Sequence, residues 1–234
     1  LCQDVLVGYI RRREYPFSIS STGRVFNSVT GLKRELRKCL RLAGEPIAGI
    51  DIRCAQPALL GLMMIQDTPS DGWKGCSTYK VEPAGSAGGG SAGCLPAGFL
   101  EWLKLVSDGS VYDVLGDSLG LDRDTVKHGV LVDVLAKKGN YPSKIEDAFR
   151  DRFPTVHEFI RRTNRGDHAE LIRRLQTAES DFVIHTVAPR LVDSIPVLSL
   201  HDALYGRLGD LDDIQQAFQD ASSQQGFSMA FKRE

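Results

Sequence analysis

The sequence lacks any apolar run that approaches the roughly 20 residues of a membrane-spanning helix. Its first residues contain no apolar h-region, so a secretory signal is not expected. Cysteine is present in an odd number, five, and no two cysteines have C-x-x-C spacing. These absences argue against membrane contact, a disulfide scaffold and a zinc ribbon, and they favour a cytoplasmic protein with reduced thiols.

The chain also has almost no excess charge, because 29 Lys and Arg face 30 Asp and Glu. With 234 residues, 42% of them hydrophobic, it can bury a core as one large domain or as two packed lobes. The sequence begins with Leu1 instead of Met, which favours an excised piece of a longer protein.

Positive charge is nevertheless concentrated in two places. Between residues 11 and 41, nine Lys or Arg stand against two acids. Five arginines form the second group: Arg161, Arg162, Arg165, Arg173 and Arg174. Local basic patches on a neutral chain are typical of a groove for a nucleic-acid backbone. Two solvated helix faces explain the same charges equally well.

The stretch Pro46–Met64, PIAGIDIRCAQPALLGLMM, contains the first candidate catalytic residue. Residues 47–52 form a short apolar run with a single charge, Asp51. Pro57 suits the first turn of a helix, and the apolar residues after it supply the buried face of that helix. The pattern predicts a buried strand that presents one carboxylate at its end and leads directly into a helix. An aspartate in this position can also simply cap a turn.

A second apolar stretch, Pro196–Gly206, is interrupted by the polar pair His201–Asp202. Strand, tight turn and strand predict a β-hairpin with Asp202 at its tip. Two buried strands that each offer an aspartate meet the requirement of a two-metal phosphoryl-transfer site. His201 can equally be a structural histidine beside the turn.

The rest of the chain is mostly helical in pattern. Asp122 is a candidate N-cap for a helix that runs to about Lys138, and Arg123 and Lys127 share one face of it. Further helices are expected at residues 99–105, 112–115, 143–153, 154–162, 168–192 and 211–224, and a closing strand at 227–231. The expected fold is therefore α+β: a small antiparallel sheet carries both aspartates, and a mostly helical insert lies between them.

Periodicity disappears between Asp67 and Gly98. Within this segment, Gly85–Gly93 contains only Gly, Ser and Ala, a composition that behaves as a flexible coil. Its regularity favours an engineered linker in place of a removed loop, and a natural low-complexity loop is the alternative.

In their order, these elements resemble the palm and fingers of family A DNA polymerases and of the related single-subunit phage RNA polymerases. The resemblance covers residue 20 to the C-terminus. It rests on Asp51 in a motif-A-like strand, Arg123 and Lys127 on a helix, and His201–Asp202 in a hairpin. Smaller features that agree are Gly23–Arg24, Arg37, Phe153–Pro154, Gln176 and Glu179.

The resemblance implies a right-hand polymerase palm with a helical fingers insertion and a reduced or absent thumb. Residues 1–66 and 166–234 would form the palm, 99–165 the fingers, and 67–98 a mobile loop. It also implies template-dependent addition of nucleotides to a primer 3′ end, with two Mg²⁺ ions, or Mn²⁺, as cofactors. The implied partners are primer–template nucleic acid and nucleoside triphosphates.

The same resemblance implies roles for individual residues. Asp51 and Asp202 would be catalytic and would hold the metal ions, with Ile52 as a neighbouring ligand. Arg123 and Lys127 would grip the incoming triphosphate. The residues implied to contact nucleic acid are Arg24, Arg37, Gln176, Glu179 and His201.

Three positions depart from the family's pattern. Gln56 stands where the family has the Glu that filters the sugar, Leu135 replaces an aromatic residue of the fingers helix, and Ala203 replaces a Glu. Gln56 can hydrogen-bond a 2′-hydroxyl, and Leu135 offers no ring. We therefore expect both to contact the nucleotide and sugar selection to be weak.

Other functions remain open. One is a polymerase-derived module that binds nucleic acid without catalysis, although such a module has no need of two aspartates. RNA polymerase or primase-type activity is another. A metal phosphohydrolase ranks last, because the other four histidines show no grouping around the His201–Asp202 hairpin.

Overall fold

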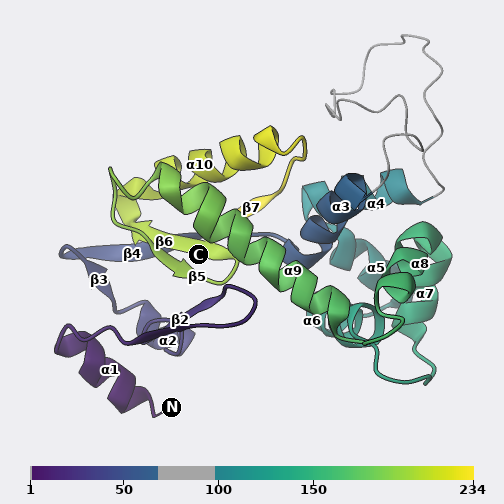
Figure 1. Cartoon of the computed structure of the whole chain (residues 1–234), viewed down its shortest axis with the longest axis horizontal. Helices are drawn as coiled ribbons and strands as arrows, with labels where there is room; N and C mark the ends of the chain where they lie inside the picture. Colours follow the sequence, from purple (N-terminus) through teal and green to yellow (C-terminus); the bar gives the residue numbers. More distant parts are fainter. Residues whose placement is uncertain (1, 68–97) are drawn as a thin grey trace, which may run out of the picture. The chain divides into compact units, whose positions relative to one another are not determined.

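The computed structural model describes residues 2–67 and 98–234, which fall into two compact units (Figure 1). Unit 1 comprises the described residues up to 55 together with 173–221 and 231–234, and unit 2 comprises those of 56–172 and 222–230. The predicted boundaries lie at residues 66 and 166, whereas the units divide between residues 55 and 56 and between residues 172 and 173. The Gly/Ser/Ala tract at 85–93 lies outside the described residues. No helix within the described ranges is both long and apolar enough to cross a bilayer.

Unit 1 is built on a five-stranded antiparallel sheet. Its central strand, β4 (Glu45–Ile52), pairs with β6 (Ala203–Arg207) on one edge. The other edge of β4 pairs with β3 (Arg41–Leu42) and with β7 (Phe231–Arg233). β5 (Leu198–Leu200) forms a hairpin with β6. The prediction of an α+β fold with a small antiparallel sheet is confirmed, although the closing strand starts later than predicted.

The sequence of β4 explains its central place. Its last five residues are buried, as expected for an apolar strand with neighbours on both edges. Gly49 lies opposite Tyr205 of β6, and a Cβ at this position would come within 2.9 Å of the tyrosine ring. The absence of a side chain at Gly49 therefore lets the Tyr205 ring pack directly against β4.

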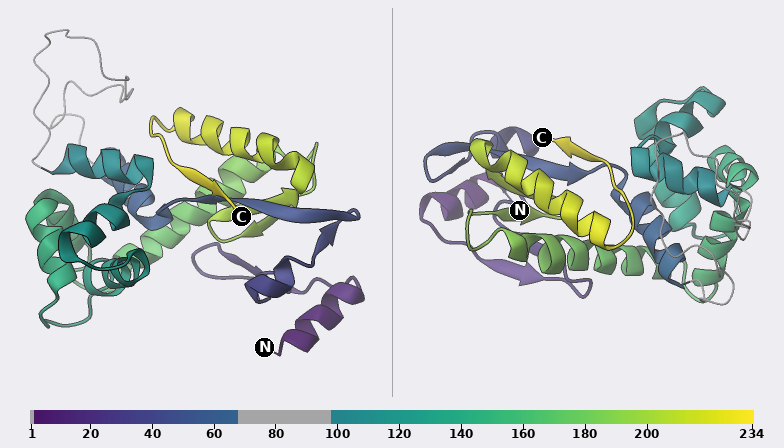
Figure 2. Two further views of the ribbon diagram at one scale, coloured as in Figure 1. Left: turned by 180° about the vertical axis from the view of Figure 1, so that it is seen from behind. Right: turned by 90° about the horizontal axis from the view of Figure 1, so that it is seen from above.

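Two helices, α9 (Glu170–Ser180) and α10 (Leu211–Gln224), lie alongside the sheet, as Figures 1 and 2 show. Rings of Phe182, Phe218 and Phe231 pack in sequence, with centroids 6.1 and 5.2 Å apart. α9 continues as a π-helix (Asp181–Val187) and then as a 3₁₀ turn (Ala188–Arg190). A second 3₁₀ turn (Leu208–Asp210) leads directly into α10. The remaining elements are α1 (Gln3–Arg11), the ribbon of β1 (Phe17–Ile19) and β2 (Val25–Asn27), and α2 (Arg34–Arg37).

Unit 2 is helical. Its elements are α3 (Ala55–Asp67), whose first residue ends the first segment of unit 1, α4 (Phe99–Asp108), α5 (Val111–Leu119), α6 (Arg123–Gly129), a π-helix (Val130–Leu135), α7 (Lys144–Arg152) and α8 (Pro154–Thr163). The rings of Trp102, Phe149 and Phe153 meet edge to face, with centroids 5.2–5.3 Å apart, in its core. Asp122 and Ser143 cap α6 and α7 as predicted.

Candidate active site

The candidate site in unit 1 is organised around Asp51, the second-last residue of β4. Its register partners are Ala203 on β6 and Lys232 on β7. The backbone N–H of Ile52 donates to the carbonyl of Asp202 at 3.3 Å. The hairpin turn therefore brings Asp202 beside the end of β4, and the two aspartates singled out by the sequence come together.

The Asp51 carboxylate is held in an unfavourable environment. Only 11% of its side chain is exposed. Burial, and after it the charge of Asp202, raise the pKa of Asp51 to about 7, while the hydrogen bond from Lys232 works in the opposite direction. Lys232 Nζ lies 2.7 Å from Oδ2. Asp51 Oδ1 is buried and has no hydrogen-bond partner among the described residues, so one carboxylate oxygen remains unused.

Lys232 is a residue that sequence reasoning missed. Its Nζ also lies 3.2 Å from Oε1 of Glu234, whose Oε2 accepts a hydrogen bond from the Tyr205 hydroxyl at 2.6 Å. Burial works to raise the pKa of Glu234, but the hydrogen bonds from Tyr205 and Lys232 outweigh it and lower that pKa. Lys232 follows the predicted closing strand at 227–231, and the register that sets it opposite Asp51 was not visible in the sequence.

Two predicted nucleic-acid contacts from distant segments also meet in unit 1. Nη2 and Nε of Arg24 lie 2.7 and 2.9 Å from Oε1 of Glu179, whose side chain is 3% exposed. Burial raises the pKa of Glu179 and outweighs the lowering effect of Arg24, and the charge of Asp51 adds to the rise. Gln176 accepts a hydrogen bond from Thr22 at 3.4 Å. The β1–β2 ribbon is thus tied to α9 beside the two aspartates.

His201 lies at the hairpin tip, in the left-handed backbone region with φ 54°. Such a conformation is costly for a residue with a side chain, so the surrounding contacts must stabilise it. Its ring packs edge-on against Phe26, with centroids 5.5 Å apart. Burial, followed by the charges of Arg24 and Arg37, lowers the pKa of His201, so the ring is neutral at pH 7. Its Nδ1 is buried without a partner among the described residues.

The side chains around Asp51 include oxygen donors that suit a divalent cation. Two carboxylates lie together, and Oδ1 of Asp51 is left without a hydrogen bond. Carboxylate oxygens are the ligands that Mg²⁺ prefers. The described residues contain no group of three or more His, Cys, Asp and Glu side chains that could hold a metal ion, so the candidate donors are the two aspartates alone. These two residues fit such a cation, with Lys232 as its competitor for Oδ2.

The raised pKa of Asp51 predicts that, in the presence of a chelator, wild-type stability falls as the pH rises. The folded-state pKa of about 7 lies above the ordinary 3.8, so the contribution is fully present below about pH 4 and is lost as the pH passes 7. The expected loss is on the order of 2–4 kcal/mol. Urea unfolding of wild type and Asp51→Asn at several pH values across this range measures the loss. It is the difference between the two proteins in how the free energy of unfolding changes with pH.

The matched control for this experiment is Asp213→Asn, which changes an exposed aspartate on α10. Its pH profile should follow that of the wild type. A profile of Asp51→Asn that also parallels the wild type would show that the Asp51 carboxyl group titrates normally in the folded protein.

The predicted triphosphate contacts lie in unit 2. Arg123, the first residue of α6, forms an ion pair with Asp113 and donates to the carbonyl of Gly109 at 3.5 Å, with its guanidinium 5.4 Å from the centre of the Tyr112 ring. Lys127 is exposed and makes no ion pair with any described residue. Arg123 is therefore tied to α5 and the end of α4, whereas Lys127 is available to a ligand.

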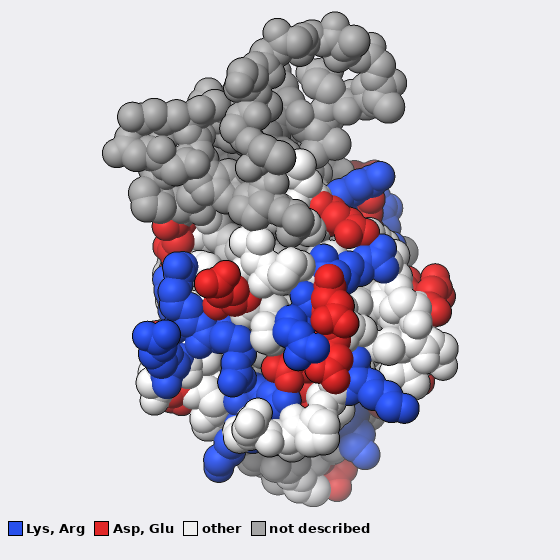
Figure 3. All heavy atoms as spheres, turned by 90° about the vertical axis from the view of Figure 1, so that its right-hand side faces the viewer, with Lys and Arg blue, Asp and Glu red and all other residues white. Residues whose placement is uncertain are grey.

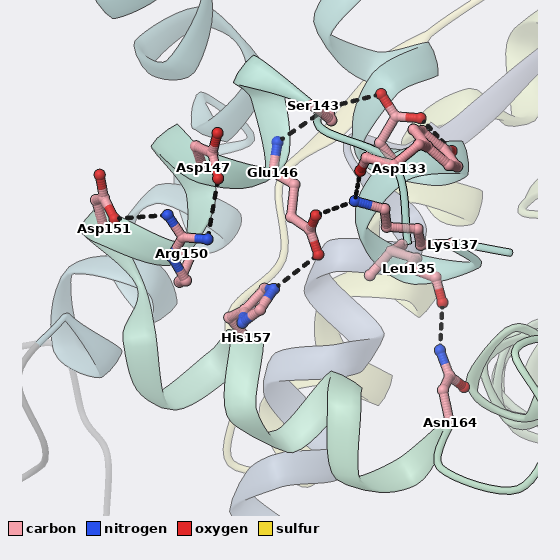
Figure 4. A network of polar contacts seen from close by, with 11 residues as sticks. Asp133, Leu135, Lys137, Ser143, Glu146, Asp147, Arg150, Asp151, His157 and Asn164 are labelled. Carbon is pink, nitrogen blue, oxygen red and sulfur yellow. Dashed lines mark hydrogen bonds and ion pairs between the residues drawn. The ribbon is translucent and has the colours of Figure 1, made fainter. Parts of the chain in front are cut away.

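The two predicted sugar contacts differ in exposure. Leu135 ends the π-helix and is fully buried, and its carbonyl accepts a hydrogen bond from Asn164 Nδ2 at 2.8 Å, as Figure 4 shows. The Leu135 side chain has no accessible surface, so it does not face a nucleotide in this conformation. Gln56 is half-buried, and its Oε1 has no hydrogen-bond partner among the described residues. Its role stays a prediction.

The comparisons with known proteins add no family to this description. Neither protein-family models nor curated protein sequences give a match to the chain. The geometry of unit 1 and the contacts within unit 2 are therefore the basis on which a function is proposed.

Proposed function

We propose that the chain is a template-dependent nucleotidyltransferase of the DNA polymerase kind, with unit 1 as its palm and the helices of unit 2 as its fingers. One observation carries the proposal. Asp51 on β4 and Asp202 in the turn between β5 and β6 lie together, and one oxygen of the buried Asp51 makes no hydrogen bond with a described residue. Two adjacent carboxylates on a rigid sheet are what two-metal phosphoryl transfer requires.

Asp51, Asp202 and the backbone of Ile52 would hold two magnesium ions. Bound magnesium supplies Lewis-acid stabilisation of charge on the reacting phosphate. Lys232 balances the charge of Asp51, and it would keep Glu234, which it already contacts, as its partner if a cation took its place beside Asp51. The hydrogen bond and charge of Lys232 work against the rise in the pKa of Asp51, so they favour the charged carboxylate that a cation requires.

Other side chains of unit 1 would position the nucleic acid. Arg24 and Arg37 supply positive charge next to the hairpin, close enough to affect the pKa of His201. Neutral His201 offers its unpartnered Nδ1 as a further hydrogen-bonding atom. Gln176 and Glu179 support this surface from α9 through Thr22 and Arg24.

The experiment that tests the proposal is primer extension by the intact protein. A labelled primer on a longer template is incubated with magnesium and each nucleoside triphosphate, and the products are sized. Template-directed extension is expected, with deoxynucleotides as substrates. A complete lack of extension with DNA and RNA templates, in magnesium and in manganese, would contradict the proposal.

A second candidate is a module that binds nucleic acid without catalysis. The ion pairs of Lys232 with Asp51 and of Arg123 with Asp113 favour it, because each engages a residue that catalysis would use. Primer–template binding without extension, together with indifference to magnesium, is the result that distinguishes it.

The available cation on α6 leads to a prediction about nucleotide use. Lys127→Ala is expected to raise the KM for the incoming nucleotide about 10-fold or more, the value of a charge-assisted hydrogen bond, with little change in stability. Arg123→Ala is expected to affect nucleotide use and also to lower the unfolding temperature, because it removes the ion pair with Asp113. Steady-state kinetics with nucleotide and with duplex varied separately, combined with thermal unfolding, measure these effects.

Lys144→Ala is the matched control, since it removes an exposed lysine from the start of α7. Its KM should stay at the wild-type value. If Lys127→Ala leaves nucleotide dependence unchanged as well, this lysine belongs to an ordinary solvated helix face.

A further inference from the structure

Unit 2 contains a groove that the proposed catalytic site does not use. It has a volume of about 690 Å³ and is formed by the end of α8, the turn at residues 164–168 and the segment that follows the π-helix, residues 137–140. Three arginines lie along it: Arg161, Arg162 and Arg165. Its acidic lining residues are Glu158 and Asp167.

The floor of the groove is held in place by hydrogen bonds. Asn164 donates from Nδ2 to the carbonyl of Leu135 at 2.8 Å, and its Oδ1 accepts from the backbone N–H of Leu171 at 2.9 Å. Lys137, which is buried, is bound by Glu146 and by the carbonyl of Tyr141. Because these groups are already satisfied, the groove is formed before any ligand arrives.

The arginines, in contrast, are exposed, and none of the three makes an ion pair with a described residue. Glu158 precedes Arg161 by three residues and Arg162 by four, the spacings at which helical ion pairs form, yet it pairs with neither. The Arg162 guanidinium lies 5.4 Å from the centre of the Phe159 ring. Figure 3 views the side on which α7 and α8 lie in Figure 1, where basic side chains gather in clusters with acidic ones between them.

We infer that this groove binds the phosphate backbone of a single-stranded nucleic acid. Guanidinium groups bind phosphate oxygens in pairs, and arginine planes also stack on bases. The volume falls in the range of small-molecule sites and accommodates a short length of single strand. The inference does not depend on catalysis at Asp51, because binding here requires neither metal nor nucleotide.

The test is fluorescence anisotropy with the intact protein in the presence of a chelator. The probe is a labelled oligothymidine of about 12 nucleotides. The triple variant Arg161→Gln/Arg162→Gln/Arg165→Gln is expected to bind it at least about 10-fold more weakly and to reduce the slope of log K against log salt by about 2, since each lost phosphate contact accounts for about 0.7 on a single strand. The chelator removes any metal that catalysis would require, which separates this inference from the catalytic proposal.

Arg165→Gln and Arg150→Gln form the matched single pair. Arg150 is an exposed arginine on α7 that does not line the groove and is paired with Asp147 and Asp151. Only Arg165→Gln should weaken binding. Circular dichroism checks that the variants are folded, which is expected because all of the changed side chains are exposed.

Three results would overturn the inference. The first is oligothymidine binding that the triple variant retains in full. The second is displacement of the oligothymidine probe by inorganic triphosphate at the same concentration as the probe, which would assign the groove to a free phosphate compound. The third is an equal loss of affinity for a blunt duplex, which would assign the arginines to duplex binding.

Discussion

Asp51→Asn and Asp202→Asn are each expected to reduce nucleotide incorporation by about 1000-fold or more, because a catalytic metal contributes several kcal/mol to the transition state. Both substitutions keep the size of the side chain and remove its charge. Asp51 lies in a buried strand and Asp202 at the tip of the paired hairpin, so neither change disturbs the sheet register. Binding of primer–template should remain, since it depends on basic side chains.

The measurement is single-turnover incorporation of one nucleotide at saturating primer–template and magnesium. Asp210→Asn serves as a control at a similarly buried position. The Asp210 carboxylate also lies in unit 1 but is paired with Arg207 at 2.7 Å. It should retain the wild-type rate in the folded fraction of the protein. If a variant without both Asp51 and Asp202 still extends primers, the two-metal assignment is wrong.

The same variants offer a second readout that does not involve activity. Magnesium is expected to raise the unfolding temperature of the wild type, because a ligand that binds only the folded state stabilises it. Asp51→Asn should lose this response. It should also be more stable than the wild type in chelator at pH 7 to 8, since the cost of burying the Asp51 charge, which raises the pKa of this group, is gone.

The sequence was sufficient to predict the two strands of the site, for a physical reason. Asp51 and His201–Asp202 are the only charged or strongly polar breaks in two apolar runs, and a polar residue at the end of a buried strand marks a turn or a site. The pairing of Arg24 with Glu179 was not predictable in the same way. Its partners are 155 residues apart, and each is unremarkable in its own segment.

The helix after Asp122 shows another limit of sequence reasoning. Its pattern predicts a continuous α-helix to about Lys138, but the chain forms α6 and then a π-helix that ends at Leu135. A Cβ on Gly129, at this junction, would lie 2.2 Å from Cδ1 of Ile145. Such close packing against α7 is a tertiary contact, and π-helical turns are rare enough that local propensity does not predict them. The wider π-helical turn changes the direction in which the side chains of this segment point, including that of Leu135.

Lys137→Met is expected to lower the free energy of unfolding by about 3–5 kcal/mol, the cost of removing one partner of a buried ion pair. Lys137 and Glu146 form such a pair in unit 2, with 4% and 11% of their side chains exposed. Lys137 also donates to the carbonyl of Tyr141. Methionine keeps the apolar stem of lysine and fills its space, so the loss comes from the charge and the hydrogen bonds.

The pH dependence of this loss follows from the position of Glu146. As Figure 4 shows, its carboxylate lies between Lys137 and His157, with 3.1 Å to His157 Nε2. Burial works to raise the pKa of Glu146, but the hydrogen bonds from Lys137 and His157 outweigh it and hold that pKa below the ordinary 4.5. The wild-type contribution is therefore present above pH 4.5 and is lost as the pH falls through the lower folded-state value. In Lys137→Met the balance shifts toward burial, so the difference from wild type should be larger at pH 7 than at pH 4.

The effect is measured by urea unfolding of the intact protein at both pH values, with far-ultraviolet circular dichroism as the signal. Lys138→Met is the matched control, because it makes the same change at the neighbouring exposed position and should alter stability by less than about 0.5 kcal/mol. The double variant Lys137→Met/Glu146→Gln should recover part of the loss, since it leaves no uncompensated charge in the core. Equal urea midpoints for Lys137→Met and Lys138→Met would mean that water reaches the Glu146 carboxylate, and the network would then contribute little to the stability of unit 2.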